Sequence, residues 1–231
     1  METSINLPQI PHKVQESFKK NHFEQETWAL NGYIIGIDEV GRGCSAGPVV
    51  AAAVMLHPHA KHPLLKDSKL LTHAELEKAA EWIKKHAWWG IGIASNHTID
   101  TVNIYKATQE AMCRALAQLQ SITPQKPSKI LVDAMPLTQQ TFQAETLYFI
   151  KGERKSTSIA AASIIAKVYR DQLMEKLSFS FPGYQLAKHK GYCTPCHQLA
   201  TATYGMSIIH RSKWFEDKQP KEENGQQNLF C

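Results

Sequence analysis

An apolar run early in the chain reads Tyr33-Ile-Ile-Gly-Ile37 and continues at once into Asp38-Glu39-Val-Gly-Arg-Gly43. A short isoleucine-rich run that ends at a glycine-containing turn is typical of a buried strand. Carboxylates at the end of such a strand stay ionised only where a cation compensates them, so Asp38 and Glu39 indicate a metal site. The alternative is a strand that ends in an ordinary solvated acidic turn.

Neighbouring side chains of a regular strand point to opposite faces of its sheet. For both carboxylates to reach one site, the strand must end at Asp38 and Glu39, or Glu39 must contribute partly through its backbone carbonyl. Gly41 and Gly43 permit a sharp turn at this point. Their exposed amides can also approach a sugar or a phosphate closely.

The second apolar run extends from Pro48 to Leu56, after a turn that is too short for a crossover helix. The two runs are therefore expected to pair antiparallel. Thr72-His-Ala-Glu75 fits a capping box that opens a helix. The remaining pattern predicts helices over 72–86, 103–120 and 158–177, strands over 87–94, 129–133 and 146–150, and a further helix capped by Thr194 with Pro195 at its first position.

Strands that alternate with helices predict an α/β fold with a mixed sheet of about five strands, flanked by helices and followed by a helical C-terminal region. Residues 1–30 are expected to be a helical lead-in, 31–216 the catalytic domain, and 217–231 a flexible polar tail. If strands 33–38 and 129–133 are parallel neighbours, Asp133 meets Asp38 at the carboxyl edge of the sheet, where open α/β sheets place their sites.

The composition is that of a globular protein, with 231 residues, 43% of them hydrophobic, and a formal charge of +5. A positive charge permits a polyanionic partner without requiring one. The sequence has no apolar run of membrane-spanning length and no export signal, so a cytoplasmic protein is expected. Five cysteines without an export signal argue against a disulfide framework.

Asp171 is a further acidic candidate, with Lys167 four residues before it on the same face of a predicted helix. A plain surface ion pair with Lys167 is the alternative. Asp38, Glu39, Asp133 and Asp171 together form an all-oxygen set suited to Mg²⁺ or Mn²⁺. Two such ions about 4 Å apart can activate water and stabilise the leaving oxygen in phosphodiester hydrolysis.

At this point the sequence resembles a known family, ribonuclease HII. The resemblance covers nearly the whole chain, and its matches stand in order. They are Gly36-Ile-Asp-Glu-Val-Gly-Arg-Gly43, Ala46-Gly-Pro-Val-Val-Ala-Ala-Ala53, Asp67-Ser-Lys69, Ile99-Asp-Thr-Val-Asn-Ile104, Val132-Asp133, Lys151-Gly152, Ser158-Ile-Ala-Ala-Ala-Ser-Ile-Ile-Ala-Lys167, Arg170-Asp171 and His189-Lys-Gly-Tyr192.

The resemblance implies an RNase H-like fold and an endonuclease that hydrolyses the RNA strand of RNA/DNA hybrids. It also implies cleavage at single ribonucleotides embedded in duplex DNA, with products that end in 3′-hydroxyl and 5′-phosphate. Carried over residue by residue, it makes Asp38, Glu39, Asp133 and Asp171 the catalytic set, which binds two divalent ions.

The same resemblance implies a substrate-binding surface. Gly41, Arg42 and Gly43 become the loop that senses the ribose 2′-hydroxyl, and Tyr192 the aromatic that packs against the next sugar. Phosphate contacts are expected from Lys69, Lys167 and Lys190. The chain departs from the family at Cys44-Ser45, where proline and a small or apolar residue are usual, which puts the stiffness of the loop in question.

Cys193-Thr-Pro-Cys196-His197 competes with this reading, because it matches the pattern for covalent haem attachment and, with His189, a zinc-like set. Haem attachment of this kind needs an exported chain, and the sequence has no second cysteine pair for a structural zinc. The motif is interpreted as a family loop in which two cysteines happen to fall.

Gln226-Gln-Asn-Leu229-Phe230 resembles the short peptide with which bacterial replication and repair proteins dock on the sliding clamp. An unstructured tail without a partner is the alternative. Otherwise a monomer is expected, with nucleic acid as its partner and no membrane. Two other functions stay open at this point: an RNase H-like nuclease that acts on DNA, and a binding protein of the same fold that has lost activity.

Overall fold

The computed structural model describes residues 11–14, 18–137 and 142–216. Within these ranges six strands form one mixed sheet, in the order β1-β6-β5-β2-β3-β4. The central strand β2 pairs antiparallel with β3, as predicted, and parallel with β5, which meets the condition set for Asp133 to reach Asp38. The strands are β1 (His12–Lys13), β2 (Tyr33–Val40), β3 (Val49–Leu56), β4 (Ala87–Ala94), β5 (Pro127–Asp133) and β6 (Glu145–Phe149).

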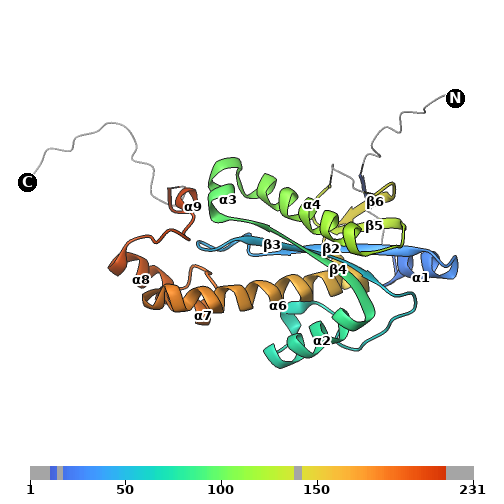
Figure 1. Cartoon of the computed structure of the whole chain (residues 1–231), viewed down its shortest axis with the longest axis horizontal. Coiled ribbons are helices and arrows are strands. Elements are labelled where there is room, and N and C mark those ends of the chain that lie inside the picture. Colours follow the sequence, from blue (N-terminus) through green and yellow to red (C-terminus); the bar gives the residue numbers. More distant parts are fainter. Residues whose placement is uncertain (1–10, 15–17, 138–141, 217–231) are drawn as a thin grey trace, which may run out of the picture.

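Helices cover both faces of the sheet, with α4 on one side and α6 and α2 on the other (Figure 1). The C-terminal helices α7, α8 and α9 gather beyond one end of the sheet. The helices are α1 (His22–Ala29), α2 (His73–His86), α3 (Asn96–Val102), α4 (Ile104–Ile122), α5 (Gly152–Lys155), α6 (Thr157–Ser180), α7 (Leu186–His189), α8 (Pro195–Tyr204) and α9 (Ser212–Glu216), with 3₁₀ turns η1 (Ser68–Leu70) and η2 (Pro182–Tyr184).

The predicted cap signals are confirmed. Thr72 caps α2 in a reciprocal capping box, since its side chain accepts from the amide of Glu75 and its own amide donates to the Glu75 carboxylate. Thr194 caps α8 with a single bond, since its side chain accepts from the amide of His197, and Pro195 is at the first helical position. Both helix starts could be predicted because a cap depends only on residues within the first turn of the helix.

Two expectations need correction. The strand at 33–38 continues to Val40, because β3 pairs with it as far as Val40↔Val50. The expected helical lead-in is helical only over α1 within the described residues, and His12–Lys13 instead add a sixth strand beside β6. A two-residue strand carries no periodicity that a sequence could reveal.

Close packing of α6 on β2 sets the geometry of the site. A Cβ atom at Gly36 would lie 2.1 Å from the backbone carbonyl carbon of Ser158, so only glycine fits there. The alanine-rich start of α6 packs against β2 and β3. It buries Ala161 and Ile165 in the core cluster that lies between the sheet and the helices α6 and α2. On the opposite face α4 buries Met112 against the sheet. No helix among the described residues is both long and apolar enough to cross a membrane.

Candidate active site

Asp38 lies on the central strand β2 and is only 6% exposed. Its Oδ1 accepts a hydrogen bond from the Glu39 amide at 2.7 Å, and the side chain of Ser163 on α6 also bonds to it. Burial raises the pKa of Asp38 well above its ordinary value, and the charges of Glu39 and Asp133 raise it further. The ionised form of such a carboxylate would be stabilised by a nearby cation.

Glu39 is the next residue of the same strand, and its Oε1 accepts from Arg42 Nη1 at 3.2 Å. Burial raises the pKa of Glu39 although the Arg42 guanidinium opposes the shift, and the charge of Asp133 adds to it. The second carboxylate oxygen, Oε2, is buried and has no hydrogen-bond partner. A buried acceptor without a partner is uncommon and is able to accept a bond from a ligand.

Asp133 ends β5, which runs parallel to β2 with Val132 opposite Ile37. This pairing is why two carboxylates that are 95 positions apart in sequence meet at one sheet edge, as predicted. Its Oδ1 accepts from the Gly152 amide at 2.7 Å. Burial raises the pKa of Asp133, the charge of Glu153 adds to this, and Lys69 opposes it.

Asp171 lies on α6 and is 8% exposed. It forms an ion pair with Lys167 at 2.9 Å. The ion pair given as the alternative to a catalytic role for Asp171 is therefore present. Its charge also acts on Tyr192, whose pKa is raised chiefly by burial. Asp171, Lys167 and Tyr192 line the same open pocket, which has a volume of about 570 Å³.

Across the described ranges, no three or more His, Cys, Asp or Glu side chains form a group that could hold a metal ion as they stand. The donor set nevertheless fits a divalent cation. Its members Asp38, Glu39 and Asp133 offer only oxygen, the preferred donor of Mg²⁺ and Mn²⁺. All three have raised pKa values, and one oxygen of Glu39 is buried without a partner.

A loop between β2 and β3, residues 41–48, borders these carboxylates and is held by two buried arginines. Arg211 donates from Nη2, Nη1 and Nε to three loop carbonyls at 2.7, 3.0 and 2.9 Å. Arg170 donates to the carbonyls of Pro48 and Ala46 and to that of Lys190. The carbonyls held by Arg211 are those of Gly41, Arg42 and Gly47.

Gly41 has a positive φ of 96°, and a Cβ atom there would lie 2.3 Å from Nε of Arg170. Gly43 differs, because a Cβ at this position would meet no atom within 4 Å. The loop therefore has a clamped inner side and an open outer side at Gly43. An open glycine backbone is accessible to a ligand that approaches closely.

Tyr192 is 40% exposed, and its side chain hydrogen-bonds with Cys44 of this loop. The lysines expected to contact phosphates differ in setting. Lys69 is close enough to Asp133 to lower its pKa, against the larger effect of burial. Lys167 pairs with Asp171, and Lys190 pairs with Glu175 at 2.8 Å.

The sequence did not predict that Arg170 and Arg211 hold the carbonyls of the 41–48 loop. Arg170 precedes Asp171 in a motif that resembles the family, but nothing in that motif indicated that Arg170 is fully buried. Arg211 carried no signal, because a lone arginine in a polar segment usually remains on the surface. Cys193 and Cys196 are free thiols in the structure. Gln226, Leu229 and Phe230 lie outside the described residues.

Comparison with known proteins gives the chain's relatives. The family model described as Ribonuclease HII matches residues 35–216. Ribonuclease HII of Listeria monocytogenes is 49% identical over 190 residues, which covers 82% of this chain and 70% of that protein. The Levilactobacillus brevis protein of the same name is 43% identical over 213 residues, which covers 89% and 80% of the two chains.

Two solved structures have the same fold. Ribonuclease H2 of Pyrococcus horikoshii aligns with a TM-score of 0.66 at 26% identity, covering 79% of this chain and 93% of that one. RNase HII of Archaeoglobus fulgidus, solved in complex with PCNA, aligns with a TM-score of 0.63 at 25% identity, covering 78% and 94%. These alignments place the mixed sheet and its helices in the RNase H-like fold.

Proposed function

Because the chain belongs to the ribonuclease HII family, whose members cleave the RNA strand of RNA/DNA hybrids, we propose that Asp38, Glu39, Asp133 and Asp171 are its metal-binding catalytic residues. One observation carries the proposal. Buried Asp38 and half-buried Glu39 and Asp133, on adjacent strands, have raised pKa values, and Glu39 Oε2 has no hydrogen-bond partner. Such a set is satisfied by divalent cations.

The enzyme depends on a divalent metal, and we propose that Mg²⁺ or Mn²⁺ serves, with two ions in the catalytic state. When bound, these ions supply an activated water and charge stabilisation at the leaving 3′-oxygen. The chain's own part is to hold the oxygen ligands. The Glu39 and Gly152 amides each hold one oxygen of Asp38 and of Asp133 in place.

Selection of RNA is assigned to the 41–43 backbone. Only the 2′-hydroxyl distinguishes a ribonucleotide from DNA, and a backbone-lined turn can hydrogen-bond to it at close range. The open position of Gly43 and the clamped carbonyls of Gly41 and Arg42 support this role. Tyr192, partly exposed beside the loop, is proposed to pack against the sugar that follows the ribonucleotide.

Lys69, Lys167 and Lys190 are proposed to contact phosphates of the substrate. Such contacts contribute affinity and salt dependence rather than sequence selection. The ion pairs of Lys167 and Lys190 with Asp171 and Glu175 orient both ammonium groups at the mouth of the pocket that Tyr192 lines. A monomeric enzyme that works in the cytoplasm is proposed as well.

The test is cleavage of a DNA duplex that contains one ribonucleotide, with Mg²⁺, Mn²⁺ or chelator, by wild type and Asp38→Asn. We expect cleavage that leaves 3′-hydroxyl and 5′-phosphate ends with either ion, and no cleavage in chelator. In the variant we expect the cleavage rate to fall at least about 10³-fold, because a ligand of the activating ion is weakened. Equal cleavage of the all-DNA duplex, or full activity of Asp38→Asn, would refute the assignment.

We also propose that Gln226, Leu229 and Phe230 dock on a sliding clamp. The tail sequence supports this, and the relative from Archaeoglobus fulgidus was solved in complex with PCNA. Truncation after Glu223 should abolish binding to an immobilised clamp and leave hybrid cleavage at the wild-type rate, because two apolar anchors of a peptide-in-groove contact are removed. Undiminished clamp binding by the truncated chain would exclude the tail as the docking peptide.

A further inference from the structure

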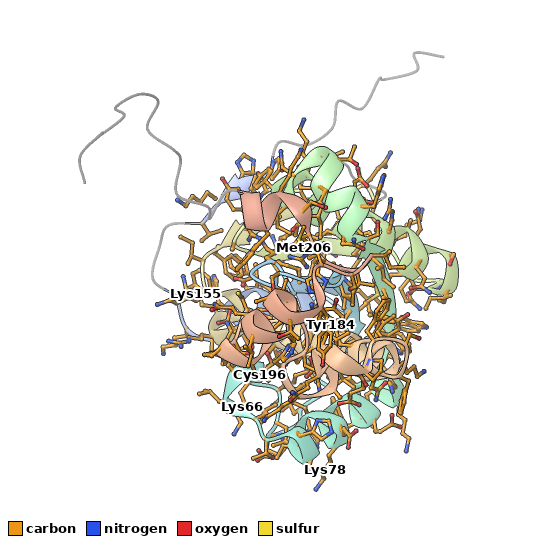
Figure 2. All side chains as sticks on the ribbon, turned by 90° about the vertical axis from the view of Figure 1, so that its left-hand side faces the viewer. Lys66, Lys78, Lys155, Tyr184, Cys196 and Met206 are labelled. Atoms are coloured by element: carbon orange, nitrogen blue, oxygen red, sulfur yellow. The ribbon has the colours of Figure 1, made fainter. Side chains whose placement is uncertain are left out.

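Three buried histidines lie together at the end of the molecule that α7 and α8 cover. Figure 2 looks onto this end and shows Tyr184, Cys196 and Met206 on it. His189, His197 and His210 are at most 8% exposed and come from α7, α8 and the segment before α9. The rings of His189 and His197 stack with centroids 4.2 Å apart. The site proposed above does not use any of the three.

Backbone partners fix which nitrogen of each ring carries the proton. A neutral imidazole has one N–H donor and one acceptor nitrogen. Nδ1 of His210 accepts from the Ser207 amide at 3.0 Å, so the proton of His210 is on Nε2. That Nε2–H donates to Nε2 of His197 at 3.1 Å. The proton of His197 is therefore on Nδ1, where it is donated to the Tyr192 carbonyl at 2.9 Å.

The relay is directional, because its first partner can only donate and its last can only accept. It begins at the Ser207 amide, passes through His210 and His197, and ends at the Tyr192 carbonyl. An added proton on either ring would set two N–H groups against each other. Burial lowers the pKa of His197 and of His210, in the latter case to about 4, which agrees with two neutral rings.

The end of the relay joins the two elements proposed to read the substrate. Ser45, in the 41–48 loop, contacts Nδ1 of His197 at 3.3 Å and donates to the Gly191 carbonyl. Its amide bonds to the same carbonyl at 3.0 Å. His189 fixes the other side of this turn, since its Nδ1 accepts from the Gly191 amide and its Nε2–H donates to the Tyr184 carbonyl.

We propose that His210 and His197 are positioning residues that fix the backbone of Tyr192, and with it the ring that packs against the substrate sugar, through a relay with one allowed tautomer order. The proposal rests on the function proposed for Tyr192. It makes the direction of donation, rather than the bulk of the two rings, the property that substrate recognition requires.

Two amide replacements of His210 separate direction from bulk. The longer amide of His210→Gln can still donate to His197 Nε2, whereas the amide of His210→Asn reaches only the Ser207 end. We expect kcat/KM on the single-ribonucleotide duplex to fall roughly 10- to 100-fold in His210→Asn, because the Tyr192 ring loses its fixed position. His210→Gln should restore most of it. Equal loss in both variants, at equal thermal stability, would overturn the proposal.

A double-mutant cycle tests whether the effect passes through Tyr192. In a Tyr192→Ala background, His210→Asn should cause no further loss of kcat/KM, and a further loss as large as that in wild type would overturn the proposal. Wild-type activity of Tyr192→Ala would refute the role assigned to Tyr192 and the proposal with it. A defect in Tyr192→Ala beside full activity of His210→Asn would overturn the relay alone.

The tautomers can be read without any activity measurement. Nitrogen-15 NMR of the imidazole rings in the full chain at neutral pH should show His197 as the Nδ1–H form and His189 and His210 as Nε2–H forms. His197 as the Nε2–H form, or as imidazolium, would overturn the relay whatever the kinetics show.

Discussion

At the scale of single residues, burial and like-charge repulsion disfavour the ionised form of the candidate site's carboxylates. Asp38 is buried, close to Glu39 and influenced by Asp133, and its raised pKa reflects first burial and then these charges. A group with a raised folded-state pKa contributes stability below its unfolded pKa and loses it as pH rises through the folded value. Without cations the charged carboxylate set is therefore a source of instability near neutral pH.

Asp38→Asn should make the metal-free protein more stable while it abolishes cleavage. The amide keeps an acceptor oxygen for the Glu39 amide but removes the buried charge, so we expect a gain of roughly 1–2 kcal/mol in the free energy of unfolding at neutral pH. Thermal unfolding in chelator and in Mn²⁺ measures it. Wild type should gain stability from Mn²⁺ and the variant much less; a variant less stable than wild type in chelator would contradict this account.

Arg211→Met should destabilise the fold by about 3 kcal/mol, because three carbonyls of the 41–48 loop would lose their buried donor. Arg114→Met is the matched control. That guanidinium is half exposed, and its contacts with Glu110 and with the Ile93 carbonyl are exposed to solvent, so its loss should change stability by no more than about 0.5 kcal/mol. Urea unfolding of the two variants compares them, and similar midpoints would show that the buried contacts add little.

The carboxylates could be predicted from the sequence because an acidic residue that ends an apolar run is a local signal, as at Asp133. The buried arginines could not. Arg211 acquires its role only from carbonyls about 170 residues earlier in the chain, and no local pattern records such a contact. The unpartnered Oε2 of Glu39 is likewise a property of the fold, visible only once the side chains are packed.

At the scale of elements, the site depends on how closely α6 approaches β2. Gly36 permits that approach, which brings Ser163 to Asp38. The sequence predicted both elements, since an alanine-rich helix and an apolar strand are local patterns. It did not predict that β2 continues to Val40, because this extension depends on pairing with β3. A strand's end is set by its partner as much as by its own residues.

Gly36→Ala and Gly43→Ala should separate folding from function. A Cβ at Gly36 would overlap the α6 backbone, so we expect a loss of about 3 kcal/mol or more in stability. A Cβ at Gly43 meets nothing, so that variant should fold normally and cleave slowly if the 2′-hydroxyl must approach this backbone. Thermal unfolding and the cleavage assay measure the two effects; full activity of Gly43→Ala would argue against close approach.

The C-terminal elements should loosen in acid. His210 has its pKa lowered to about 4 by burial and by the neighbouring rings of His197 and His189, and it also contacts the ring of Tyr184. A lowered histidine pKa contributes stability above the unfolded value near 6.5, and this is lost as pH falls towards 4. Hydrogen exchange of α8 amides should therefore speed up across this window in wild type and less in His210→Gln.

At the scale of the whole molecule, sequence alone predicted an α/β fold with a mixed sheet, and the family match and solved relatives confirm it. The antiparallel pairing of β2 with β3 follows from the short connection between them, which is a local feature. The sixth strand and the arrangement of the C-terminal helices around His197 do not, because both depend on contacts between distant segments.

The arginine contacts also bear on the order in which the protein is made. The sheet and α6 are complete once residue 180 has been added, but Arg211 bonds to carbonyls 164 to 170 positions before it. Because chains fold as they leave the ribosome, a nascent chain can assemble its sheet while the loop beside Asp38 still lacks its clamp. We therefore expect the nuclease to mature only as Arg211 clears the exit tunnel, after the sheet and α6 have already formed.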